Sequence, residues 1–397
     1  MPSRRWFLTS VGAATAALAQ WRSAAMAQVR SLGAPVSGYG NRAGFERALR
    51  LFPNTRTPEA TASLTPLRDS YGIITPSSLH FERHHGGVPE IDPAAHNLMV
   101  HGLVDRPLVF TMDELKRMPA ASRVLFIECS GNSSSEWLGA GAPTVQRTHG
   151  LTSCSEWTGV WLSTLLRECG VRASASWVLA EGADAVRMAR SLPMAKAMDD
   201  VLIAYAQNGE ALRPEQGYPL RLVAAGWEGN VNVKWLRRVE ALDGPAMTRW
   251  ETARYTDLMP DGKARQFTFV MDAKSVITAP SGGDTLRGPG VYEISGLAWS
   301  GRGAIRRVDV TIDGGVTWLP AELQAPVLPR AHTRFRWSWR WDGREALIAS
   351  RCEDESGYVQ PRRQDLVRER GANSGYHQNG IQAWKVAATG AVTNGNA

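Results

Sequence analysis

Cysteine is scarce in this chain, since only four of its 397 residues are cysteines. None of them forms a C-x-x-C pair, and the C-x-x-C-H motif is absent. The chain therefore has neither the cysteine spacing of a zinc or iron–sulfur site nor an attachment site for a c-type haem. The adjacent His84 and His85 do not make a two-histidine metal site either, because neighbouring side chains on a strand point to opposite faces. What remains is a lone soft thiol among dispersed polar and basic residues.

Long apolar runs are lacking as well. After the N-terminus, no segment approaches the roughly 18 apolar residues that a membrane-spanning helix needs. The N-terminus combines Arg4 and Arg5 with a short, weakly apolar stretch at residues 11–19 and small residues at 25–27. This pattern is typical of a cleavable twin-arginine export signal over residues 1–27. We expect a mature chain in the periplasm, exported already folded.

Motifs for nucleotide or nucleic-acid binding are also absent. The sequence contains neither a Walker loop nor the glycine fingerprint of a Rossmann fold, and no nucleic-acid-binding module. The formal net charge is +7, and the basic residues are scattered rather than clustered. This modest positive balance favours an anionic ligand or an acidic partner.

Chain length and composition predict two folded domains that follow an arm. Residues 28–75 are rich in Gly, Pro, Ser and Thr, and they are interpreted as an arm without a core of its own, with one helix at 42–51. Apolar clusters between turn signals predict strands in residues 76–266, and capping or apolar stripes predict helices. The expected strands are 98–104, 108–110, 123–129, 177–180, 201–205 and 220–223, and the expected helices are 111–119 and 159–170. Because the two kinds of element do not alternate regularly, the domain is predicted to be α+β rather than doubly wound.

Residues 267–397 have few helical signals and are predicted to form a second domain made of strands. Val308, Val310 and Ile312 alternate with polar residues before a Gly-Gly turn. Residues 335–341 alternate aromatic side chains with Arg and Ser, which gives this strand one apolar face. The pattern predicts an immunoglobulin-like β-sandwich with tryptophans in its core, whose arginine face is solvated or meets a partner.

Cys129 is the first candidate functional residue. It ends the apolar run 123–129 and is followed by a Ser-Gly-Asn turn. A thiol at this position can be a metal ligand or a nucleophile, or a small buried hydrophobic residue, which is the usual role of a free cysteine. Cys154, Cys169 and Cys352 are assigned that last role.

Several segments give the chain a family resemblance. Residues 81–85, 128–132, 216–221 and 232–236 occur in the order and context of the sulfite oxidase family of molybdenum enzymes. Residues 295–300 and 313–318 resemble the C-terminal dimerisation domain of that family.

A closer likeness lies within the family. Residues 65–70, 73–76 and 148–157 are similar to the molybdenum subunits of sulfane dehydrogenases, which act in thiosulfate oxidation. The likeness covers nearly all of the mature chain. It implies an α+β, sulfite-oxidase-type molybdopterin domain over residues 76–266 and a β-sandwich dimerisation domain over residues 267–397.

The resemblance also implies a cofactor and its binding residues. Molybdenum is expected to be held by the dithiolene of one molybdopterin and by the thiolate of Cys129, because a soft thiolate suits this metal. Arg83 and Tyr255 match residues beside the substrate. The residues that match the cofactor-binding positions are Phe81, Glu82, Arg83, His84, His85, Asp184, Gln216, Arg221, Asn232, Val233 and Lys234. Gln216 departs from the animal enzymes, which have a histidine there. Taken singly, each of these polar residues is also compatible with a solvated or ion-paired role.

A second departure from the family concerns the substrate. Ser133 and Ser134 stand where sulfite oxidases have paired arginines that help to bind sulfite. A less charged pocket fits a larger substrate, such as sulfane sulfur on a carrier-protein cysteine. The expected partners are that carrier protein, a dihaem c-type cytochrome subunit that accepts the electrons, and a second copy of this chain within a heterotetramer. A sulfite dehydrogenase, a periplasmic sulfoxide reductase and a pterin-free export scaffold remain alternatives.

Overall fold

The computed structural model describes residues 35–53, 57–139 and 141–395. The expected export signal over residues 1–27 and the first part of the arm lie outside the described residues. The described residues 35–47 belong to a first unit, which has bends and a turn but no helix or strand, and the residues from Ala48 onward form a second unit. Among the described residues, no helix has the length and apolar character that a membrane crossing requires.

The helix expected at residues 42–51 is wrong. The chain makes a turn at residues 44–45, and Leu51 forms a β-bridge with Leu64. Phe45 and Leu49 are exposed, so the apolar stripe lacks the packing that stabilises a short helix.

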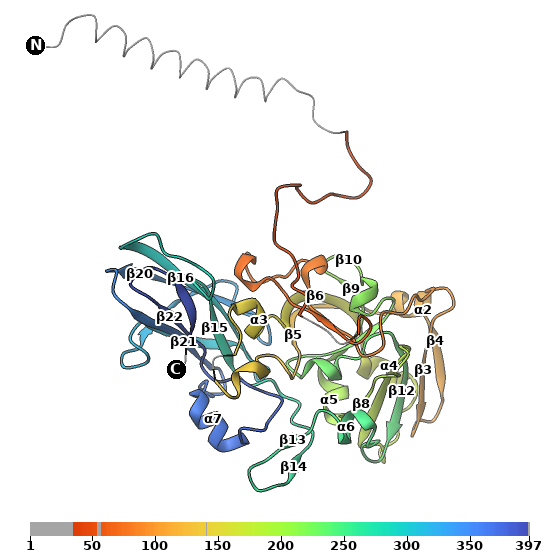
Figure 1. Ribbon diagram of the computed structural model, residues 1–397. Coiled ribbons are helices and arrows are strands. Elements are labelled where there is room, and N and C mark those ends of the chain that lie inside the picture. Colours follow the sequence, from red (N-terminus) through yellow and green to blue (C-terminus); the bar gives the residue numbers. More distant parts are fainter. Residues whose placement is uncertain (1–34, 54–56, 140, 396–397) are drawn as a thin grey trace, which may run out of the picture. The chain divides into compact units, whose positions relative to one another are not determined.

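The first domain contains short helices and two larger sheets (Figure 1). Its strands are β1 (Ala62–Ser63), β2 (Glu82–Arg83), β3 (Asn97–Gly102), β4 (Leu108–Thr111), β5 (Ala121–Glu128), β6 (Thr152–Trp161), β7 (Trp177–Gly182), β8 (Ala189–Pro193), β9 (Val201–Gln207), β10 (Glu210–Ala211), β11 (Arg221–Ala224), β12 (Leu236–Leu242), β13 (Asp257–Leu258) and β14 (Ala264–Arg265). Its helices are α2 (Met112–Arg117), α3 (Val145–His149), α4 (Leu162–Glu168), α5 (Met194–Asp199) and α6 (Arg249–Thr252), with the 3₁₀ turns η1 (Leu67–Asp69), η2 (Ser77–Leu79), η3 (Ser134–Glu136), η4 (Pro214–Gln216) and η5 (Gly229–Val231).

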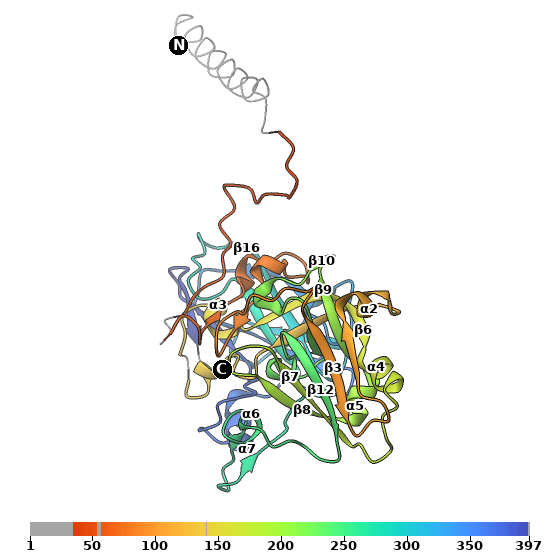
Figure 2. The same ribbon diagram turned by 90° about the vertical axis from the view of Figure 1, so that its right-hand side faces the viewer.

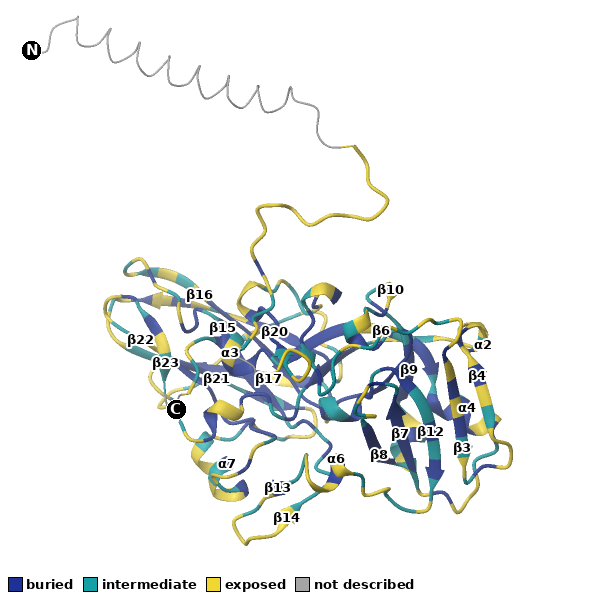
Figure 3. Cartoon of the chain, turned by 45° about the vertical axis from the view of Figure 1, so that its right-hand side comes forward, coloured by how far each residue is buried: buried dark blue, intermediate teal, exposed yellow. Residues whose placement is uncertain are grey.

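Of the two larger sheets of this domain, one is antiparallel throughout and the other is mixed in direction. One has the order β10-β9-β6-β5, with β11 also paired to β9, and the other has the order β4-β3-β12-β7-β8. The pair β12–β3 is parallel, whereas the neighbouring pairs β12–β7 and β3–β4 are antiparallel. Edge strand β4 is largely exposed and the inner strand β7 is buried (Figure 3). This architecture confirms the α+β fold predicted from the sequence.

Two local predictions for this domain can be compared with the structure. The capping box of Thr111 and Glu114 forms and begins α2 as predicted. The helix expected from residue 159 begins only at Leu162, because residues up to Trp161 pair with β9 and continue strand β6. Strand pairing over Trp157–Trp161 therefore prevails over the helical periodicity of the same residues.

The second domain is a sandwich of two sheets. Its strands are β15 (Lys274–Ala279), β16 (Gly290–Trp299), β17 (Ile305–Thr311), β18 (Leu319–Pro320), β19 (Glu322–Gln324), β20 (Thr333–Trp341), β21 (Ala346–Asp354), β22 (Ala383–Val386) and β23 (Val392–Gly395), and α7 (Arg363–Arg370) precedes β22. The sheets have the orders β15-β16-β20-β19 and β18-β17-β21-β22-β23. Figure 2 gives the view at right angles to Figure 1. The predicted β-sandwich is confirmed.

The aromatic strand β20 packs as its alternation predicts, with one exception. Phe335, Trp339 and Trp341 are buried, whereas Trp337 is only partly buried. On the opposite face, Arg334 is buried and donates to the carbonyls of Ser70 and Gly72. This arginine thus holds the end of the arm against the sandwich.

One hydrophobic cluster extends across both domains. Phe126 of β5 and Cys154 of β6 are fully buried together with Trp299 and Trp384 of the sandwich. Cys169 and Cys352 are buried in apolar clusters as well, so three of the four cysteines have the packing role expected for them. Strand β5 consequently lies between the two domains, and its end carries Cys129.

Candidate active site

Cys129 follows the last residue of β5 and begins a tight turn. Its backbone N–H donates to Leu151 O over 3.0 Å, and its carbonyl accepts from Asn132 N over 2.8 Å. Burial raises the pKa of the thiol, while the backbone N–H of Gly131 and the charge of Arg83 act in the opposite direction. A thiol in this environment needs a bound cation to become a thiolate at neutral pH, as metal ligation provides.

An inner pocket of about 680 Å³ lies beside Cys129. Most of the residues expected from the sequence line it, although they come from segments far apart in the chain. These residues are Phe81, Arg83, His84, His85, Cys129, Asp184, Gln216, Arg221, Asn232, Val233, Lys234 and Tyr255. Glu82 does not line the pocket. It lies behind, where its carboxylate binds His84 Nε2 at 2.7 Å and forms an ion pair with Arg50.

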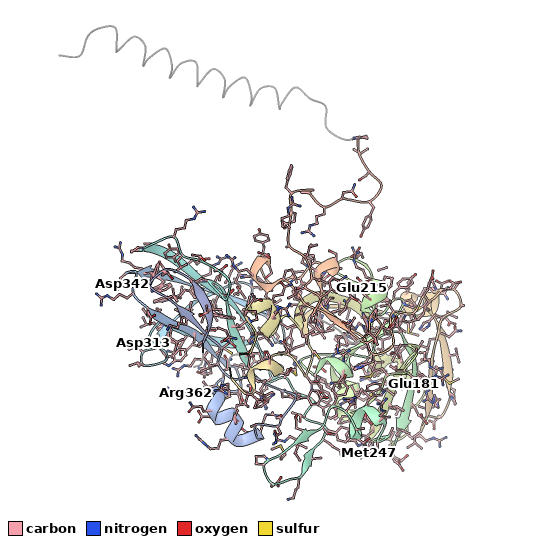
Figure 4. The ribbon with its side chains drawn as sticks, in the orientation of Figure 1. Glu181, Glu215, Met247, Asp313, Asp342 and Arg362 are labelled. Atoms are coloured by element: carbon pink, nitrogen blue, oxygen red, sulfur yellow. The ribbon has the colours of Figure 1, made fainter. Side chains whose placement is uncertain are left out.

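Two cations, the buried Arg221 and the partly buried Lys234, face this pocket. Arg221 donates to the backbone and side-chain oxygens of Gln216 and to Asn232 O, and its Nε is buried without a hydrogen-bond partner. Lys234 lies 2.7 Å from His84 Nδ1 and donates to the carbonyl of Glu215, which is labelled in Figure 4. Among the described residues, neither cation forms a salt bridge with a carboxylate.

Desolvation acts strongly on both cations. Burial lowers the pKa of Arg221 to about 9, so the guanidinium is still charged at neutral pH. Burial, and then the neighbouring Arg221, lower the pKa of Lys234 well below its usual value. Two largely desolvated cations that repel each other are stabilised when an anionic ligand lies between them.

Gln216 and the backbone carbonyl of Asn232 hold the Arg221 guanidinium, and neither residue offers a free side chain. The amide of Gln216 donates to Phe81 O over 3.0 Å, and its oxygen accepts from Arg221. The amide of Asn232 bonds Ala224 N and Glu228 O, so its side chain holds the local backbone. The glutamine that replaces the histidine of animal enzymes therefore has a defined structural role here.

Asp184 is the acidic residue of the inner pocket. One of its oxygens accepts from Met188 N over 2.9 Å. Burial raises the pKa of this carboxyl, although the amide of Met188 and the charge of Lys234 partly oppose the rise. Its second oxygen can accept a hydrogen bond from an amino edge of a ligand in the pocket.

Tyr255 lies where the inner pocket meets a wider outer cavity. Its hydroxyl is 2.8 Å from His85 Nε2, and the Arg190 guanidinium lies 5.3 Å from its ring centre. Burial, followed by the charge of Arg83, lowers the pKa of His85 to about 3, and burial above all raises the pKa of Tyr255. The pair is therefore a neutral imidazole with a protonated phenol, and the tautomer of His85 decides which of the two donates to the other.

The outer cavity has a volume of about 1550 Å³. Arg83, His85, Cys129 and Tyr255 line both spaces, so the two meet at these four residues. The outer cavity is further lined by Arg249, Arg254, Trp250, Tyr376, Ser134, Gly131, Gly375, Leu151, Val186 and residues 60–62. It is a basic and aromatic space that contains no carboxylate among its lining residues.

Two of the arginines in the outer cavity were not predicted from the sequence. Arg249 and Arg254 lie on and just after α6 and line the outer cavity, although nothing near Ser133 and Ser134 pointed to them. Ser133 is buried with a left-handed backbone at φ 65°, whereas Ser134 is exposed and lines the cavity. The capping box of Thr248 and Glu251 was the one available signal for the helix that carries the first arginine.

The inner pocket suits the cofactor that the resemblance implies. An anionic phosphate suits Arg221 and Lys234, the amino edge of a pterin suits Asp184, and a soft metal suits Cys129. The unpaired Nε of buried Arg221 supports this fit, because a buried donor normally has a partner. No group of three His, Cys, Asp or Glu side chains within the described residues is arranged to hold a metal ion by itself.

Comparisons with known proteins agree with this site. The chain matches the model of the oxidoreductase molybdopterin binding domain over residues 85–250 and that of the Mo-co oxidoreductase dimerisation domain over residues 265–383. It is similar to the crystal structure of the sulfane dehydrogenase SoxCD from Paracoccus pantotrophus, with 48% identity and a TM-score of 0.91 over 93% of this chain and 96% of that chain.

Two sulfite oxidases are more distant relatives. The mitochondrial enzyme of Rattus norvegicus is 33% identical over 74% of this chain, and the enzyme of Gallus gallus is 31% identical over 73% of this chain. The matches cover 58% and 68% of those proteins, so this chain spans well under two thirds of the rat enzyme. The chain belongs to the sulfite oxidase family, with a molybdopterin-binding oxidoreductase domain followed by a Mo-co dimerisation domain.

Proposed function

We propose that this protein is the molybdenum subunit of a periplasmic sulfane dehydrogenase. In this proposal it oxidises sulfane sulfur bound to a cysteine of a carrier protein and passes the electrons to a c-type cytochrome subunit. The similarity to the structure named as a sulfane dehydrogenase supports this substrate class.

One observation carries the proposal. An inner pocket that contains the buried Arg221 and the partly buried Lys234 meets a wider outer cavity at Cys129 and Tyr255. The inner pocket suits a cofactor with an anionic tail, and the outer cavity has room for a substrate attached to a larger molecule. The cofactor and the substrate thus approach the same thiolate from two sides.

Molybdenum with one molybdopterin would be held by Cys129, Asp184, Arg221 and Lys234. When bound, it supplies two-electron oxygen-atom transfer with water as the source of oxygen. For each oxygen that the sulfane sulfur gains, one water is consumed, and two protons and two electrons are released. The protons leave to solvent through the outer cavity, and the cytochrome accepts the electrons.

The chain's own residues prepare this step. With its hydrogen on Nε2, His85 donates to the oxygen of Tyr255, and the single O–H of this phenol, kept protonated by burial, then donates towards the reacting sulfur and oxygen. Arg83 lines both spaces and supplies positive charge beside Cys129. Trp250 and Tyr376 contribute apolar surface for an aliphatic stem.

A sulfite dehydrogenase is the second candidate. The positive charge of Arg83, Arg249 and Arg254 in the outer cavity favours a small anion such as sulfite, as do the relatives named sulfite oxidase. The two candidates differ in whether the sulfur arrives free or attached to a carrier protein.

The decisive experiment assays the exported, molybdenum-loaded protein together with a c-type cytochrome. We expect haem reduction with a persulfidated carrier protein and little reduction with free sulfite. The reverse preference would favour the sulfite dehydrogenase. Molybdenum content well below one per chain would falsify both enzymatic candidates.

Cys129→Ser tests the ligand assignment in the same assay. We expect turnover to be abolished, because a hydroxyl is a hard and weakly acidic ligand for this metal. Circular dichroism should remain that of the wild type, since the swap conserves shape. Cys352→Ser, at a buried cysteine far along the chain, is the matched control and should retain turnover.

Export is proposed from Arg4 and Arg5. We expect the mature protein in the periplasmic fraction with residues 1–27 removed. Replacing both arginines by lysine should leave the precursor in the cytoplasm. Equal periplasmic amounts of the two proteins would contradict twin-arginine export.

A further inference from the structure

The side chains at the end of strand β5 alternate between two sides of the strand. Leu125 and Ile127 pack with Phe81 and Trp157, and Cys129 packs against the same cluster. Phe126 packs instead into the cluster of the β-sandwich. Since side chains alternate along a strand, the side chain of Glu128 points towards the sandwich and that of Cys129 points towards the pockets.

The carboxylate of Glu128 is completely enclosed, with 0% of the residue exposed. Its Oε1 accepts from Lys274 Nζ over 2.6 Å and from Asn132 Nδ2 over 2.9 Å, and its Oε2 accepts from Trp299 Nε1 over 2.7 Å. Lys274 and Trp299 begin and end neighbouring strands of the sandwich and lie opposite each other in the β15–β16 pair. A cross-strand pair of the second domain therefore holds a carboxylate of the first.

The same carboxylate is linked to the backbone around Cys129. Asn132, which donates to Glu128, also accepts from Leu151 N over 3.1 Å. Leu151 O in turn accepts from Cys129 N, and Cys129 O accepts from Asn132 N. The sandwich, Glu128 and the peptide groups on both sides of Cys129 thus form one connected network.

A second buried carboxylate lies next to the first. Glu228 forms a β-bridge with Glu128, and it is paired with Arg190 at 2.9 Å. The imidazole Nε2 of His377, in the second domain, lies 3.4 Å from Glu228, and the backbone N–H of His377 donates to Ser130 O over 2.8 Å. Lys274 is the cation beside Glu128, whereas Arg190 is shared between Glu228 and the buried Glu251, so the charge around Cys129 depends on both groups.

We propose that Glu128 and Lys274 are positioning residues, through which the β-sandwich sets the orientation of Cys129 and the electrostatic field at the metal that it binds. The second domain is then part of the redox unit in addition to pairing two copies. Neither residue lines the pockets, so Glu128 and Lys274 affect the metal through the hydrogen-bonded peptide groups around Cys129 and through the charge behind its thiolate. This inference rests on the proposed role of Cys129 as the metal ligand.

The test is a double-mutant cycle on the molybdenum-loaded protein, with the reduction potential of the metal as the readout. In Lys274→Gln, the unbalanced carboxylate stabilises the more oxidised metal and lowers the potential. In Glu128→Gln, the unbalanced ammonium of Lys274 raises the reduction potential of the metal. The double variant replaces the ion pair by two amides, and its potential should return close to that of the wild type.

Kinetics give a second readout. We expect Lys274→Gln to lower kcat by about tenfold, the usual effect of removing a group that orients a metal ligand, with a smaller change in KM. The double variant should recover most of this loss. A purely structural pair would lower the unfolding midpoint of both single variants and leave the potential of the folded protein unchanged, which would overturn the inference.

A milder variant covers the case in which the single charge changes do not fold. Trp299→Phe removes one donor to Glu128 and should lower the potential in the same direction as Lys274→Gln. Trp384→Phe is the matched control, because Trp384 is equally buried in the sandwich but donates to Ile277 O. Equal potentials in these two variants would overturn the inference.

The outcomes also separate this inference from the proposed function. If Cys129→Ser keeps its molybdenum and turnover, the ligand assignment fails and the inference fails with it. If Cys129→Ser is inactive while Trp299→Phe and Lys274→Gln keep the wild-type potential, only the inference fails.

Discussion

The hydroxyl of Tyr255 lies 2.8 Å from Nε2 of His85, although 170 positions separate the two residues in the chain. Tyr255 has a left-handed backbone with φ 55°, an uncommon conformation for a residue other than glycine. The positively charged Arg190 lies behind its ring. A phenol held in this way at the junction of two cavities is prepared to donate a hydrogen bond at a fixed place.

The first prediction concerns this phenol. Tyr255→Phe should lower kcat by about a hundredfold, the lower range for loss of a proton-donating group, while molybdenum content stays at the wild-type level. Steady-state kinetics and metal analysis of the same preparation check both parts. Tyr376→Phe is the control, because Tyr376 lines only the outer cavity and should keep most of kcat. Equal losses in the two variants would contradict the role of Tyr255.

The second prediction concerns the inner cations. Arg221→Met should strongly reduce the cofactor content of the purified protein, because the guanidinium faces the inner pocket with its Nε unpaired. Arg334→Met removes an arginine that is also buried but bonds only backbone and hydroxyl groups of Ser70 and Gly72. It should lower the free energy of unfolding by about 2 kcal/mol, typical of a hydrogen bond to a charged group, and retain the cofactor. Full cofactor content in Arg221→Met would refute the phosphate assignment.

The third prediction concerns the outer cavity. Arg254→Gln and Arg249→Gln should each lower kcat/KM for an anionic sulfur substrate by about tenfold, the effect of losing a charged hydrogen bond worth about 1.5 kcal/mol. Most of this loss should appear in KM, since both arginines are exposed to solvent and line the outer cavity beside Cys129. Arg340→Gln, at an exposed position of β20, is the control. Added salt should lower kcat/KM of the wild type more than that of the two variants, because salt screens the charge that the variants lack.

The fourth prediction concerns stability at acidic pH. Burial lowers the pKa of both His80 and His332 to about 3, so each is neutral in the folded protein. The unfolded chain binds protons at these residues below about pH 6.5, whereas the folded protein does so only near pH 3. The free energy of unfolding should therefore fall between pH 6.5 and pH 5 by about 2 kcal/mol for each histidine.

Urea unfolding at pH 7 and pH 5 measures this fall. His332→Gln keeps a polar partner for Thr152, which lies 3.0 Å from the imidazole, but removes the titrating group. The variant should lose less stability between the two pH values than the wild type. An identical pH dependence in both proteins would contradict the assignment.

Much of this protein follows from local sequence. The apolar run of β5, the capping box of Thr111 and Glu114 and the alternation of β20 each predicted an element that the structure contains. These signals are reliable because a cap or a two-residue period depends on neighbours a few positions away. The resemblance then located Cys129 and most residues of the inner pocket, since each lies within a short motif.

Other features depended on packing between distant segments. The helix expected at 42–51 does not form, because Phe45 and Leu49 stay exposed and Leu51 bridges to Leu64, and α4 begins late because β6 pairs with β9. Arg254 and Tyr376 are far apart in the sequence, and only the folding of the chain brings both to the outer cavity.

The sequence by itself determined the scarcity of cysteine, the single thiol at the end of a strand and the two domains. Only the tertiary structure showed that Lys274 and Trp299 of the sandwich hold the residue next to that thiol. The physical reason is that a buried carboxylate must find its partners in space, and in this fold they lie 146 and 171 positions away along the chain.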